Sequence, residues 1–596
     1  MNLMGKAGGR RRLRVSLALG TAAAAAAAAI IGVVTPSASA AVPAKDWLHV
    51  RGNQIVDEAN NPVWLTGTNW FGFNATERVF HGLWSANITQ VTKSMADRGI
   101  NLVRIPISAQ LLLEWKDGKA AVSSGVNTYA NPELVGKTSL GVFDYFLQLC
   151  EQYGIKVLLD MHSAEADNSG HNWPVWNKGT ITTDKFYEAW EYVATRYRDN
   201  DTLVAVDIKN EPHGAQNETL RAKWDNSTDA DNWRYVAETA SRKILAINPN
   251  LLVLVEGIQT SPKPGYNWTS PAQSPDLTSN FYNTWWGGDL RLAKDFPINL
   301  GTNQDQLVYS PHDYGPLVYE QPWFTGTFDK ASLETGVWGP NWLYLHKENI
   351  APLLIGEWGG RLGQDARQDR WMTALRDLIV ENRLHQTFWV LNPNSGDTGG
   401  LLLDDWKTWD EQKYALLKPA LWAYNNKFVS LDHQIPLGGA GSTTGISLGQ
   451  RYGDTPGPGP SSSSPRPSSS SPRPSSAAPS SAAPSSAAPS SAAPSSPAPS
   501  TGGCTATVRA ASTWAGGYQG EVTVTNTGTS TTRGWTVTVA TAGGTQINNL
   551  WGGVQTGNTV TNASYNGALA PAASTTLGFI ASGQAGGVTV VSCSAS

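Results

Sequence analysis

Short hydrophobic runs recur between residues 42 and 435 and alternate with segments whose apolar residues follow helical spacing. The runs predict strands at 63–69, 101–107, 156–162, 203–209, 251–256, 307–312, 352–357 and 386–391. The intervening periodicity predicts helices, among them 184–199, 231–247 and 367–382. Eight strands joined by helical crossovers favour an α/β fold of the (β/α)8 TIM barrel type. A doubly wound sheet is disfavoured because no G-x-G-x-x-G turn follows a strand.

The last hundred residues show a different pattern. Apolar and polar residues alternate over 521–527 and 534–541, with Gly, Asn and Thr between these segments, which predicts a β-sandwich over 501–596. Cys504 and Cys593 stand near the two ends of this region, so one disulfide between them is expected. Cys150 instead stands alone in an amphipathic helix pattern, which indicates a buried and inert thiol.

Two further segments lack the pattern of a folded domain. Residues 1–40 hold a basic stretch, an apolar run and the triplet Ala38-Ser39-Ala40, which predict a cleavable secretory signal; an uncleaved membrane anchor is the alternative. Residues 455–500 consist almost wholly of Pro, Ser, Ala and Gly, so they have little to bury and predict an extended tether. We therefore expect one domain at 41–435, a linker at 436–500 and a second domain at 501–596.

Composition and charge narrow the range of partners. Only 15% of residues are charged, 25 are tryptophan, and the formal net charge is −4. The first 40 residues are basic, so acidic residues dominate the predicted barrel, which argues against nucleic acid as a partner. No segment after the signal is apolar for long enough to span a membrane, so we expect a soluble, secreted, monomeric protein.

Polar and aromatic residues stand at the predicted carboxyl ends of all eight strands, where TIM barrels hold their active sites. Two glutamates at the ends of the fourth and seventh strands, in a region rich in indole rings, suit hydrolysis of a glycosidic bond. Asp160 and Asp207 lie inside strands and are interpreted as hydrogen-bonding residues of the barrel interior. No His or Cys residues cluster at metal-ligand spacing, so neither a metal nor another cofactor is expected. In chain order the strand-end residues are Trp70, Arg104, His162, Asn210, Glu211, Glu256, His312, Tyr314, Glu357 and Trp389.

Seven motifs mark the predicted barrel: NWFGF (69–73), HGLW (81–84), NEPH (210–213), NTWWGG (283–288), SPHDY (310–314), IGEWG (355–359) and NPNSGDTGG (392–400). Together they resemble the catalytic domain of glycoside hydrolase family five, close to actinobacterial endo-β-1,4-glucanases. The resemblance implies that Glu211 is the general acid/base and Glu357 the nucleophile of a retaining double displacement. In that mechanism the two carboxyl groups lie about 5–5.5 Å apart.

The same resemblance implies supporting roles for the other strand-end residues. Asn210 would bind the sugar 2-OH, and Trp389 would be the platform under the sugar at the scissile position. Arg104, His312 and Tyr314 would orient Glu357 and tune its pKa, and His162 would line the site. Glu256 would support the site without taking part in the chemistry. Trp70, Trp285 and Trp286 are predicted as further sugar platforms, with packing under a loop as the alternative.

The C-terminal region resembles a second family. Its segments CTATV, NTGTSTTRGWTV and ASYNGALAPAAS are similar to family-two carbohydrate-binding modules. This implies that Trp514, Trp551 and Tyr565 are exposed aromatics that bind crystalline cellulose, and that Trp535 is a core residue. Tyr565 stands where tryptophan is usual, so xylan or chitin remains open as the ligand.

The pattern as a whole predicts a secreted endo-β-1,4-glucanase that binds cellulose or a related β-1,4-glycan. The same chemistry on mannan, glucomannan or xylan is an alternative, because the catalytic pair does not choose among these polymers. A non-catalytic glycan-binding protein is the alternative from another class.

Overall fold

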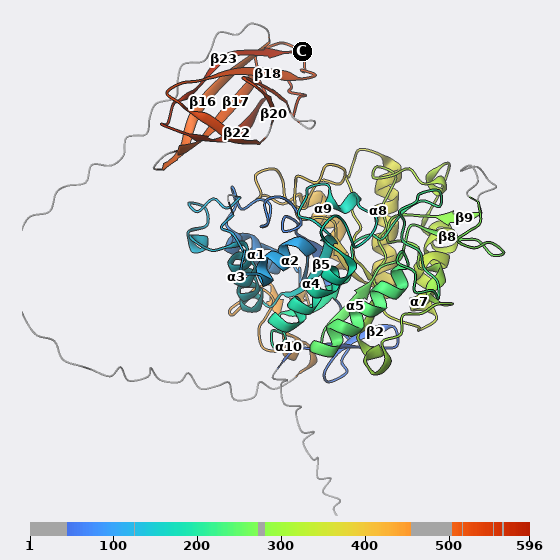
Figure 1. Ribbon diagram of the computed structural model, residues 1–596. Helices are drawn as coiled ribbons and strands as arrows, with labels where there is room; N and C mark the ends of the chain where they lie inside the picture. Colours follow the sequence, from blue (N-terminus) through green and yellow to red (C-terminus); the bar gives the residue numbers. More distant parts are fainter. Residues whose placement is uncertain are drawn as a thin grey trace, which may run out of the picture. The chain divides into compact units, whose positions relative to one another are not determined.

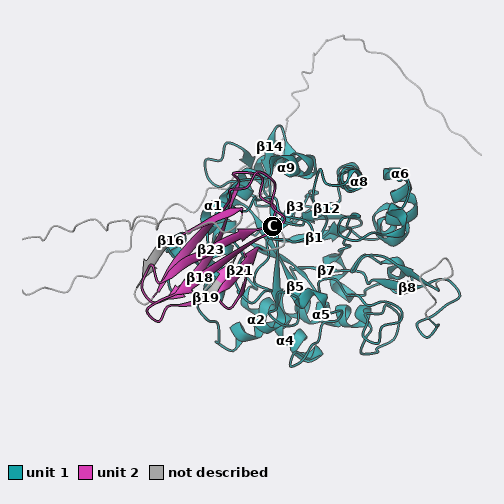
Figure 2. Ribbon diagram, turned by 90° about the horizontal axis from the view of Figure 1, so that it is seen from above, with its two compact units in different colours: residues 1–464 teal, residues 465–596 magenta. Residues whose placement is uncertain are grey.

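The computed structural model describes residues 45–453, apart from 124 and 272–279, and residues 503–596, apart from 515–516, 552 and 563–565. The chain divides into two compact units, residues 1–464 and 465–596, which are coloured separately in Figure 2. The predicted signal at 1–40 and the low-complexity tether at 455–500 lie outside the described residues. None of the described helices is long and apolar enough to cross a membrane.

Eight parallel strands form the barrel of the first unit, which confirms the predicted fold class. They pair in the order β10-β7-β6-β5-β4-β3-β12-β11. Parallel bridges between Tyr309 and Leu353 and between His312 and Glu357 close the barrel between its two outer strands. The strands are β3 (Thr66–Asn69), β4 (Leu102–Ser108), β5 (Lys156–Ser163), β6 (Leu203–Asp207), β7 (Leu252–Val255), β10 (Leu307–Tyr309), β11 (Leu354–Ile355) and β12 (His385–Phe388).

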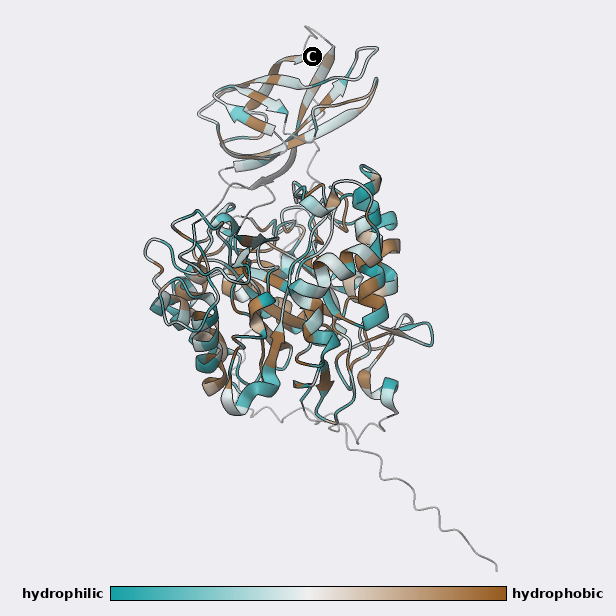
Figure 3. Ribbon diagram, turned by 90° about the vertical axis from the view of Figure 1, so that its right-hand side faces the viewer, coloured by the Kyte–Doolittle hydropathy of each residue, from teal (hydrophilic) through white to brown (hydrophobic). Residues whose placement is uncertain are grey.

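Helices surround these strands (Figure 1). They carry hydrophobic and hydrophilic residues on different sides (Figure 3), because one side packs on the barrel and the other faces solvent. The predicted helices at 184–199, 231–247 and 367–382 correspond to α4, α5 and α8. The helices are α1 (Ile88–Asp97), α2 (Ala109–Lys116), α3 (Ser139–Tyr153), α4 (Thr183–Arg196), α5 (Trp233–Ile247), α6 (Lys330–Leu333), α7 (Tyr344–Lys347), α8 (Ala366–Asn382) and α9 (Glu411–Leu417), with a π-helical segment at Glu334–Leu343.

Local sequence explains the bounds of these elements. All eight residues of β5 are buried, because one face of a barrel strand meets the interior and the other meets the helices. Helix α8 begins after Asp365, whose side chain accepts a hydrogen bond from the backbone N–H of Arg367. Helix α3 ends at Gly154, where φ is 71°, a left-handed conformation that glycine adopts readily. Cys150, on α3, is buried as predicted.

The first unit extends past residue 435, where the sequence predicted a linker to begin. Residues 436–453 include β15 (Gly445–Ile446) and α10 (Leu448–Tyr452). Leu437 and Leu448 are fully buried in the same hydrophobic core as the barrel. The predicted boundary at 435 is therefore too early. The remaining small strands are β1 (Leu48–Arg51), β2 (Gln54–Asp57), β8 (Thr260–Pro262), β9 (Phe281–Asn283), β13 (Ala423–Tyr424) and β14 (Lys427–Val429).

The second unit is a β-sandwich of two four-stranded antiparallel sheets, as predicted. One sheet has the order β16-β17-β22-β19 and the other β20-β21-β18-β23. A disulfide joins Cys504 to Cys593, and Trp535 is buried between the sheets with its indole N–H donating to the carbonyl of Asn566. The strands are β16 (Cys504–Trp514), β17 (Gly517–Asn526), β18 (Trp535–Thr541), β19 (Gln546–Trp551), β20 (Gly553–Thr556), β21 (Thr559–Asn562), β22 (Ser574–Ser582) and β23 (Val588–Ala595).

Candidate active site

Arg104, on β4, is a fully buried cation at the carboxyl end of the barrel. Burial alone would lower the pKa of Arg104, but the charges of Asp160 and Asp207 outweigh it and raise that pKa well above its usual value. The guanidinium is therefore a permanent positive charge. Four carboxylates and two amide oxygens contact it at distances of 2.8 to 3.2 Å, and they belong to Asp160, Asp207, Glu256, Glu357, Asn69 and Asn210.

Glu357, which follows β11, accepts hydrogen bonds on both carboxylate oxygens. Arg104 Nη1 donates to Oε1 at 2.8 Å, and the Tyr314 hydroxyl donates to Oε2 at 2.6 Å. The side chain is only 5% exposed. Two donors, one on β4 and one in the segment after β10, therefore hold this carboxylate in one orientation. This geometry suits the orienting role that the resemblance implies for Arg104 and Tyr314.

Glu211, which follows β6, lies opposite Glu357. His312 Nδ1 lies 3.1 Å from Glu211 Oε1 and 3.7 Å from Glu357 Oε2, so His312 contacts Glu211 more closely than the carboxylate it was predicted to orient. One oxygen of Glu211, one oxygen of Glu357 and a ring nitrogen of His312 all lie within 4.8 Å of one another. The two carboxylates therefore approach to within 4.8 Å at one pair of oxygens, a spacing compatible with the roughly 5–5.5 Å between the carboxyl groups of retaining glycosidases.

The pKa values of the two glutamates shift in opposite directions. Burial raises the pKa of Glu357, against the charges of His312 and Arg104. Burial acts in the same sense on Glu211, but the hydrogen bond and charge of His312 outweigh it and lower the pKa of Glu211 to about 2. The shift on Glu211 therefore depends on a proton held by His312, whereas the donors to Glu357 include a guanidinium whose charge does not change with pH.

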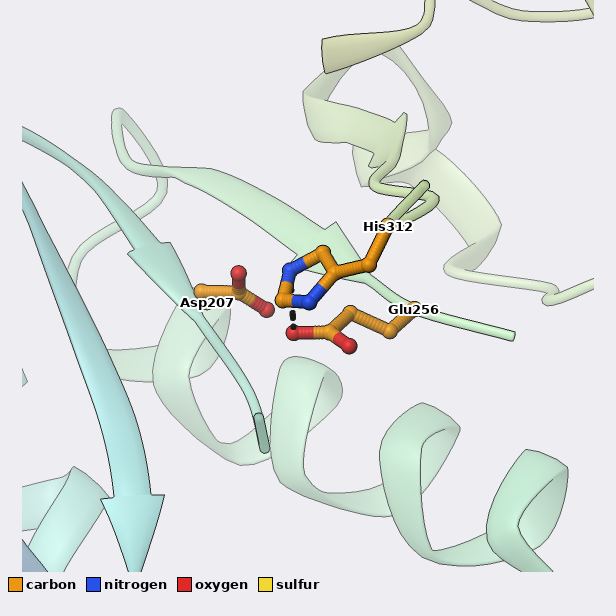
Figure 4. Close-up of side chains that lie close together, drawn as sticks. All are labelled: Asp207, Glu256 and His312. Carbon is orange, nitrogen blue, oxygen red and sulfur yellow. Dashed lines mark ion pairs between the residues drawn. The ribbon is translucent and has the colours of Figure 1, made fainter. Parts of the chain in front are cut away.

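Asp207, Glu256 and His312 form a second buried group (Figure 4), which shares His312 with the pair of Glu211 and Glu357. Their ligand atoms lie within 4.8 Å of one another, a spacing that a metal ion could bridge. Arg104 Nη2 lies 3.0 Å from Asp207 and 3.2 Å from Glu256, so its guanidinium already supplies the positive charge between these carboxylates. Burial raises the pKa of Asp207 to about 6 and that of Glu256 to about 8.

A cleft of about 910 Å³ opens at this end of the barrel, and Glu211 and Glu357 line it. Trp389 stacks on His162 with their ring planes 1° apart, and on Phe71 with the planes 13° apart. The flat face of an indole ring suits the C–H face of a pyranose ring. The aromatic residues that line the cleft are Phe71, Trp285, Trp286, Tyr314, Tyr319 and Trp389.

The other predicted sugar platforms differ in their positions. Trp70 is only 1% exposed, stacks on Phe80 in the core and donates its indole N–H to the carbonyl of His81, so the prediction of a platform is wrong. Trp286 lines the cleft and stacks on His213. Trp285 also lines the cleft but is 6% exposed, so most of its ring is packed away from a ligand.

Asn210 lines the cleft, and only one end of its side-chain amide is hydrogen-bonded among the described residues. Its Oδ1 accepts a hydrogen bond from Arg104, whereas its Nδ2 is buried without a partner in the described part of the chain. An unpaired buried donor is costly, and a sugar hydroxyl in the cleft would satisfy it. The position suits the predicted contact of Asn210 with the substrate.

Several site residues were not predicted from the sequence. Ser395 accepts a hydrogen bond from the indole N–H of Trp389, and His213 supports the ring of Trp286. Glu256 was predicted as a supporting residue, but its contact with the backbone N–H of Glu211 was not. The motifs NPNSGDTGG and NEPH contain Ser395 and His213, so motif membership was the only available signal.

The predicted binding residues of the sandwich are only partly described. Trp514 lies on β16 and Trp551 on β19, and their side chains lie outside the described residues. Tyr565 lies wholly outside them. Their roles in ligand binding stay predictions.

Comparison with known proteins agrees with this geometry. The profile of the cellulases, described as glycosyl hydrolase family 5, matches residues 56–395, and that of the cellulose binding domain matches residues 504–595. The chain is 48% identical to Endoglucanase G of Acetivibrio thermocellus over 455 residues, which covers 71% of this chain and 79% of that protein. It is 32% identical to the major extracellular endoglucanase of Xanthomonas campestris, with 66% of this chain and 74% of that protein covered.

Among solved structures, a complex of the endocellulase of Pyrococcus horikoshii with cellotetraose superposes with a TM-score of 0.56 and 33% identity, covering 63% of this chain and 98% of that one. The catalytic domain of the Xanthomonas campestris endoglucanase gives a TM-score of 0.54 and 31% identity, covering 63% of this chain and 99% of that one. With a family match across more than half of its length, the chain belongs to the cellulases of glycosyl hydrolase family 5 and carries a C-terminal cellulose binding domain.

Proposed function

We propose that this protein is a secreted endo-β-1,4-glucanase that cleaves internal bonds of cellulose, with Glu357 as nucleophile and Glu211 as acid/base. The observation that carries the proposal is the close pair of carboxylates in a cleft walled by indole rings. The separation of the pair suits a retaining mechanism, which is typical of the family.

The fixed hydrogen-bond donors support the division of roles. Glu357 receives Arg104 and Tyr314, which stabilise a carboxylate, so it is the group prepared to attack the anomeric carbon. Among the described residues, Glu211 accepts a side-chain hydrogen bond only from His312, whose proton can be exchanged, so the protonation of Glu211 can change during the reaction.

The reaction then runs in two steps. Glu357 forms a bond to the anomeric carbon while Glu211 transfers its proton to the departing glycosidic oxygen. Glu211, now ionised, takes a proton from water as the water oxygen attacks the same carbon and displaces Glu357. Arg104 and Tyr314 hold the leaving carboxylate of Glu357 at the end of the second step.

The sandwich supports a second part of the proposal. A module that binds cellulose and shares a chain with the cleft raises the local concentration of substrate without any new contact in the active site. Export is supported by the signal pattern of residues 1–40 and by the relative that is itself named extracellular.

A substrate panel tests this function. The purified mature chain should release oligosaccharides of mixed length from carboxymethylcellulose, and deletion of 501–596 should lower activity on insoluble cellulose more than on this soluble polymer. Activity confined to mannan or xylan would contradict the choice of cellulose and leave the mechanism standing. Binding to these glycans without any turnover would contradict the assignment as an enzyme.

A further inference from the structure

Glu256 is a third buried glutamate beside the proposed catalytic pair. Its carboxylate contacts Glu211 and also His312, the imidazole beside the Glu211 carboxylate. It follows β7 and is fully buried. Its Oε2 accepts a hydrogen bond from the backbone N–H of Glu211 at 2.8 Å. Its Oε1 lies 3.2 Å from His312 Nε2, the contact drawn in Figure 4, and 3.2 Å from Arg104 Nη2. One side chain therefore reaches both the backbone and the imidazole partner of the predicted acid/base.

The backbone contact matters because Glu211 has an unfavourable conformation. Its φ is 49°, in the left-handed region that non-glycine residues rarely adopt. Such a conformation persists only where its surroundings hold it in place. The hydrogen bond to Glu256 fixes the peptide N–H of Glu211, and with it the direction in which the side chain enters the cleft.

The imidazole contact matters because the two nitrogens of His312 face different carboxylates. Nδ1 lies 3.1 Å from Glu211, and Nε2 lies 3.2 Å from Glu256. A proton on Nδ1 is donated to Glu211 and keeps that carboxyl ionised. A neutral imidazole that carries its proton on Nε2, which lies 3.2 Å from Glu256 Oε1, presents an unprotonated Nδ1 to Glu211 and allows Glu211 to hold the proton that it must donate.

We propose that Glu256 is a positioning residue for Glu211, which it controls through two routes: the backbone N–H of Glu211 and the proton position of His312. The inference rests on the proposed function, because it assigns Glu211 as acid/base. Glu256 does not line the cleft and has no direct role in bond making.

Other charged groups surround Glu256 and set the conditions for this role. Burial raises the pKa of Glu256 to about 8, Asp207 acts in the same sense, and His312 and Arg104 oppose the shift. Lys209 is also buried nearby. Burial lowers the pKa of Lys209, and the charges of Glu256 and other acids oppose this shift without reversing it. The groups that face Glu256 from the adjoining strands and loops are Arg104, Asp207, Lys209, Glu211 and His312.

Gly287 lies against the Glu256 carboxylate and leaves room for it because it has no side chain. A Cβ atom at Gly287 would lie 2.3 Å from Glu256 Oε2 and 3.5 Å from the Cα of Glu211. Its φ of 71° also favours glycine. The loop that carries Trp286 therefore closes over the carboxylate of Glu256, and an alanine at 287 would displace the oxygen that binds the N–H of Glu211.

The experiment compares two substrates that differ in their need for an acid. Cellotetraose needs protonation of its leaving oxygen, whereas 2,4-dinitrophenyl β-cellobioside releases an acidic phenol that leaves without it. We expect Glu256→Gln to lower kcat/KM for cellotetraose by about 100-fold or more, the usual contribution of a general acid. The same variant should retain kcat/KM for the aryl cellobioside to within about fivefold, because bond breaking there needs no help from Glu211.

Two further variants make the result specific. Gly287→Ala should reproduce the selective loss on cellotetraose. Asp207→Asn removes a carboxylate charge from the same guanidinium without touching the backbone of Glu211, so it should change both substrates by a similar factor. Near-UV circular dichroism establishes that each variant is folded. If Glu256→Gln is unfolded, Glu256→Asp, which is too short to reach both partners, is measured instead and should show the same selectivity.

Equal losses on both substrates in the Glu256 variant, or wild-type activity on cellotetraose, would overturn the inference and leave the proposed function intact. A wild-type protein inactive on both substrates would overturn the proposed function, and the inference with it.

Discussion

Two buried charge clusters lie at opposite ends of the same barrel. The first surrounds Arg104 at the carboxyl ends of the strands and includes the proposed catalytic pair, Glu211 and Glu357. The second surrounds Lys156, the first residue of β5, at the amino ends. Its members are Asp46, Asp57, Lys156, Asp201, Asp432 and His433.

The second cluster joins distant parts of the chain. His433 Nδ1 lies 2.6 Å from Asp46 and its Nε2 lies 3.2 Å from Asp57, while Lys156 Nζ lies 3.0 Å from Asp46. These contacts tie the segment before β1 to the start of β5 and to the chain after β14. Each acid here has a cation or a backbone N–H beside it, so the cluster stabilises the end of the barrel where the strands begin.

The two clusters differ in whether their buried polar atoms have hydrogen-bond partners. In the first cluster, Asp207 Oδ1 and Asn210 Nδ2 have no hydrogen-bond partner among the described residues, and the cleft of about 910 Å³ opens beside them. Burial there raises the pKa of several acids. In the second cluster, His433 and other donors lower the pKa of Asp46 and Asp57 against burial, whereas burial raises the pKa of Asp432 to about 6. Buried charge alone therefore does not mark a catalytic site; incomplete pairing beside a cleft does.

The largest expected effect is the loss of activity in Glu357→Gln. Removing a nucleophile should lower kcat on carboxymethylcellulose by about 10⁴- to 10⁶-fold. The variant should remain as stable as the wild type to thermal unfolding, because glutamine keeps an oxygen that can accept from Arg104 and the guanidinium keeps its contacts with Asp160, Asp207 and Glu256. Retained activity would contradict the assignment. A large fall in unfolding temperature would erase the contrast between the two clusters.

His433→Leu should show the opposite result. It leaves Asp46 and Asp57 without their shared partner, so the free energy of unfolding should fall by about 3–5 kcal/mol, as for other broken buried pairs. Calorimetry measures this loss. The kcat of the folded protein below its unfolding temperature should equal that of the wild type, since His433 lies at the other end of the barrel. A selective fall in kcat would show that the two ends are coupled.

The stability supplied by this cluster should depend on pH. The carboxylates of Asp46 and Asp57 raise the pKa of His433 from 6.5 to about 9 against burial, so its stabilising charge is fully present below about pH 6.5 and is lost as pH rises through 9. The pKa values of Asp46 and Asp57 are lowered from 3.8, so their contribution is lost as pH falls below that value. The difference in unfolding temperature between wild type and His433→Leu should therefore be greatest between about pH 4 and 6.5. A constant difference up to pH 10 would contradict the pairing.

Asp201→Asn should give the smallest effect. Its side chain is 18% exposed, and its nearest oxygen lies 3.6 Å from Lys156. Asparagine keeps an oxygen that can accept the backbone N–H of Asp46. We expect a loss of about 1 kcal/mol or less in the free energy of unfolding, as for other partly exposed pairs. A loss as large as that of His433→Leu would show that the contribution of these contacts to stability does not depend on how deeply they are buried.

The sequence predicted the barrel, and it also suggested the proposed catalytic pair, because both follow from local patterns. Hydrophobic runs end close to polar residues at the rim, so Glu211 and Glu357 could be placed together before any coordinates, and Arg104, within β4, could be assigned to the same site. Trp70 also follows a strand, but its ring turns into the core against Phe80, and periodicity does not show that direction. The Gly-rich segment after residue 435 has weak patterning, which hid its packing on the core.

Long-range contacts could not be predicted in this way. Asp46, Lys156 and His433 are separated by more than a hundred residues each, and no local pattern brings them together. The contact of Glu256 with Glu211 depends on a left-handed backbone at a glutamate, which the sequence does not reveal. Such features emerge only when the strands are closed into a barrel.

Trapping of the glycosyl-enzyme tests the central claim most directly. A 2-deoxy-2-fluoro-β-cellobioside with a dinitrophenyl leaving group should form a stable ester, because the fluorine slows both steps while the good leaving group restores the rate of the first step only. Mass spectrometry of proteolytic fragments should then place one fluorocellobiosyl adduct on Glu357. An adduct on Glu211 or Glu256 would contradict the account.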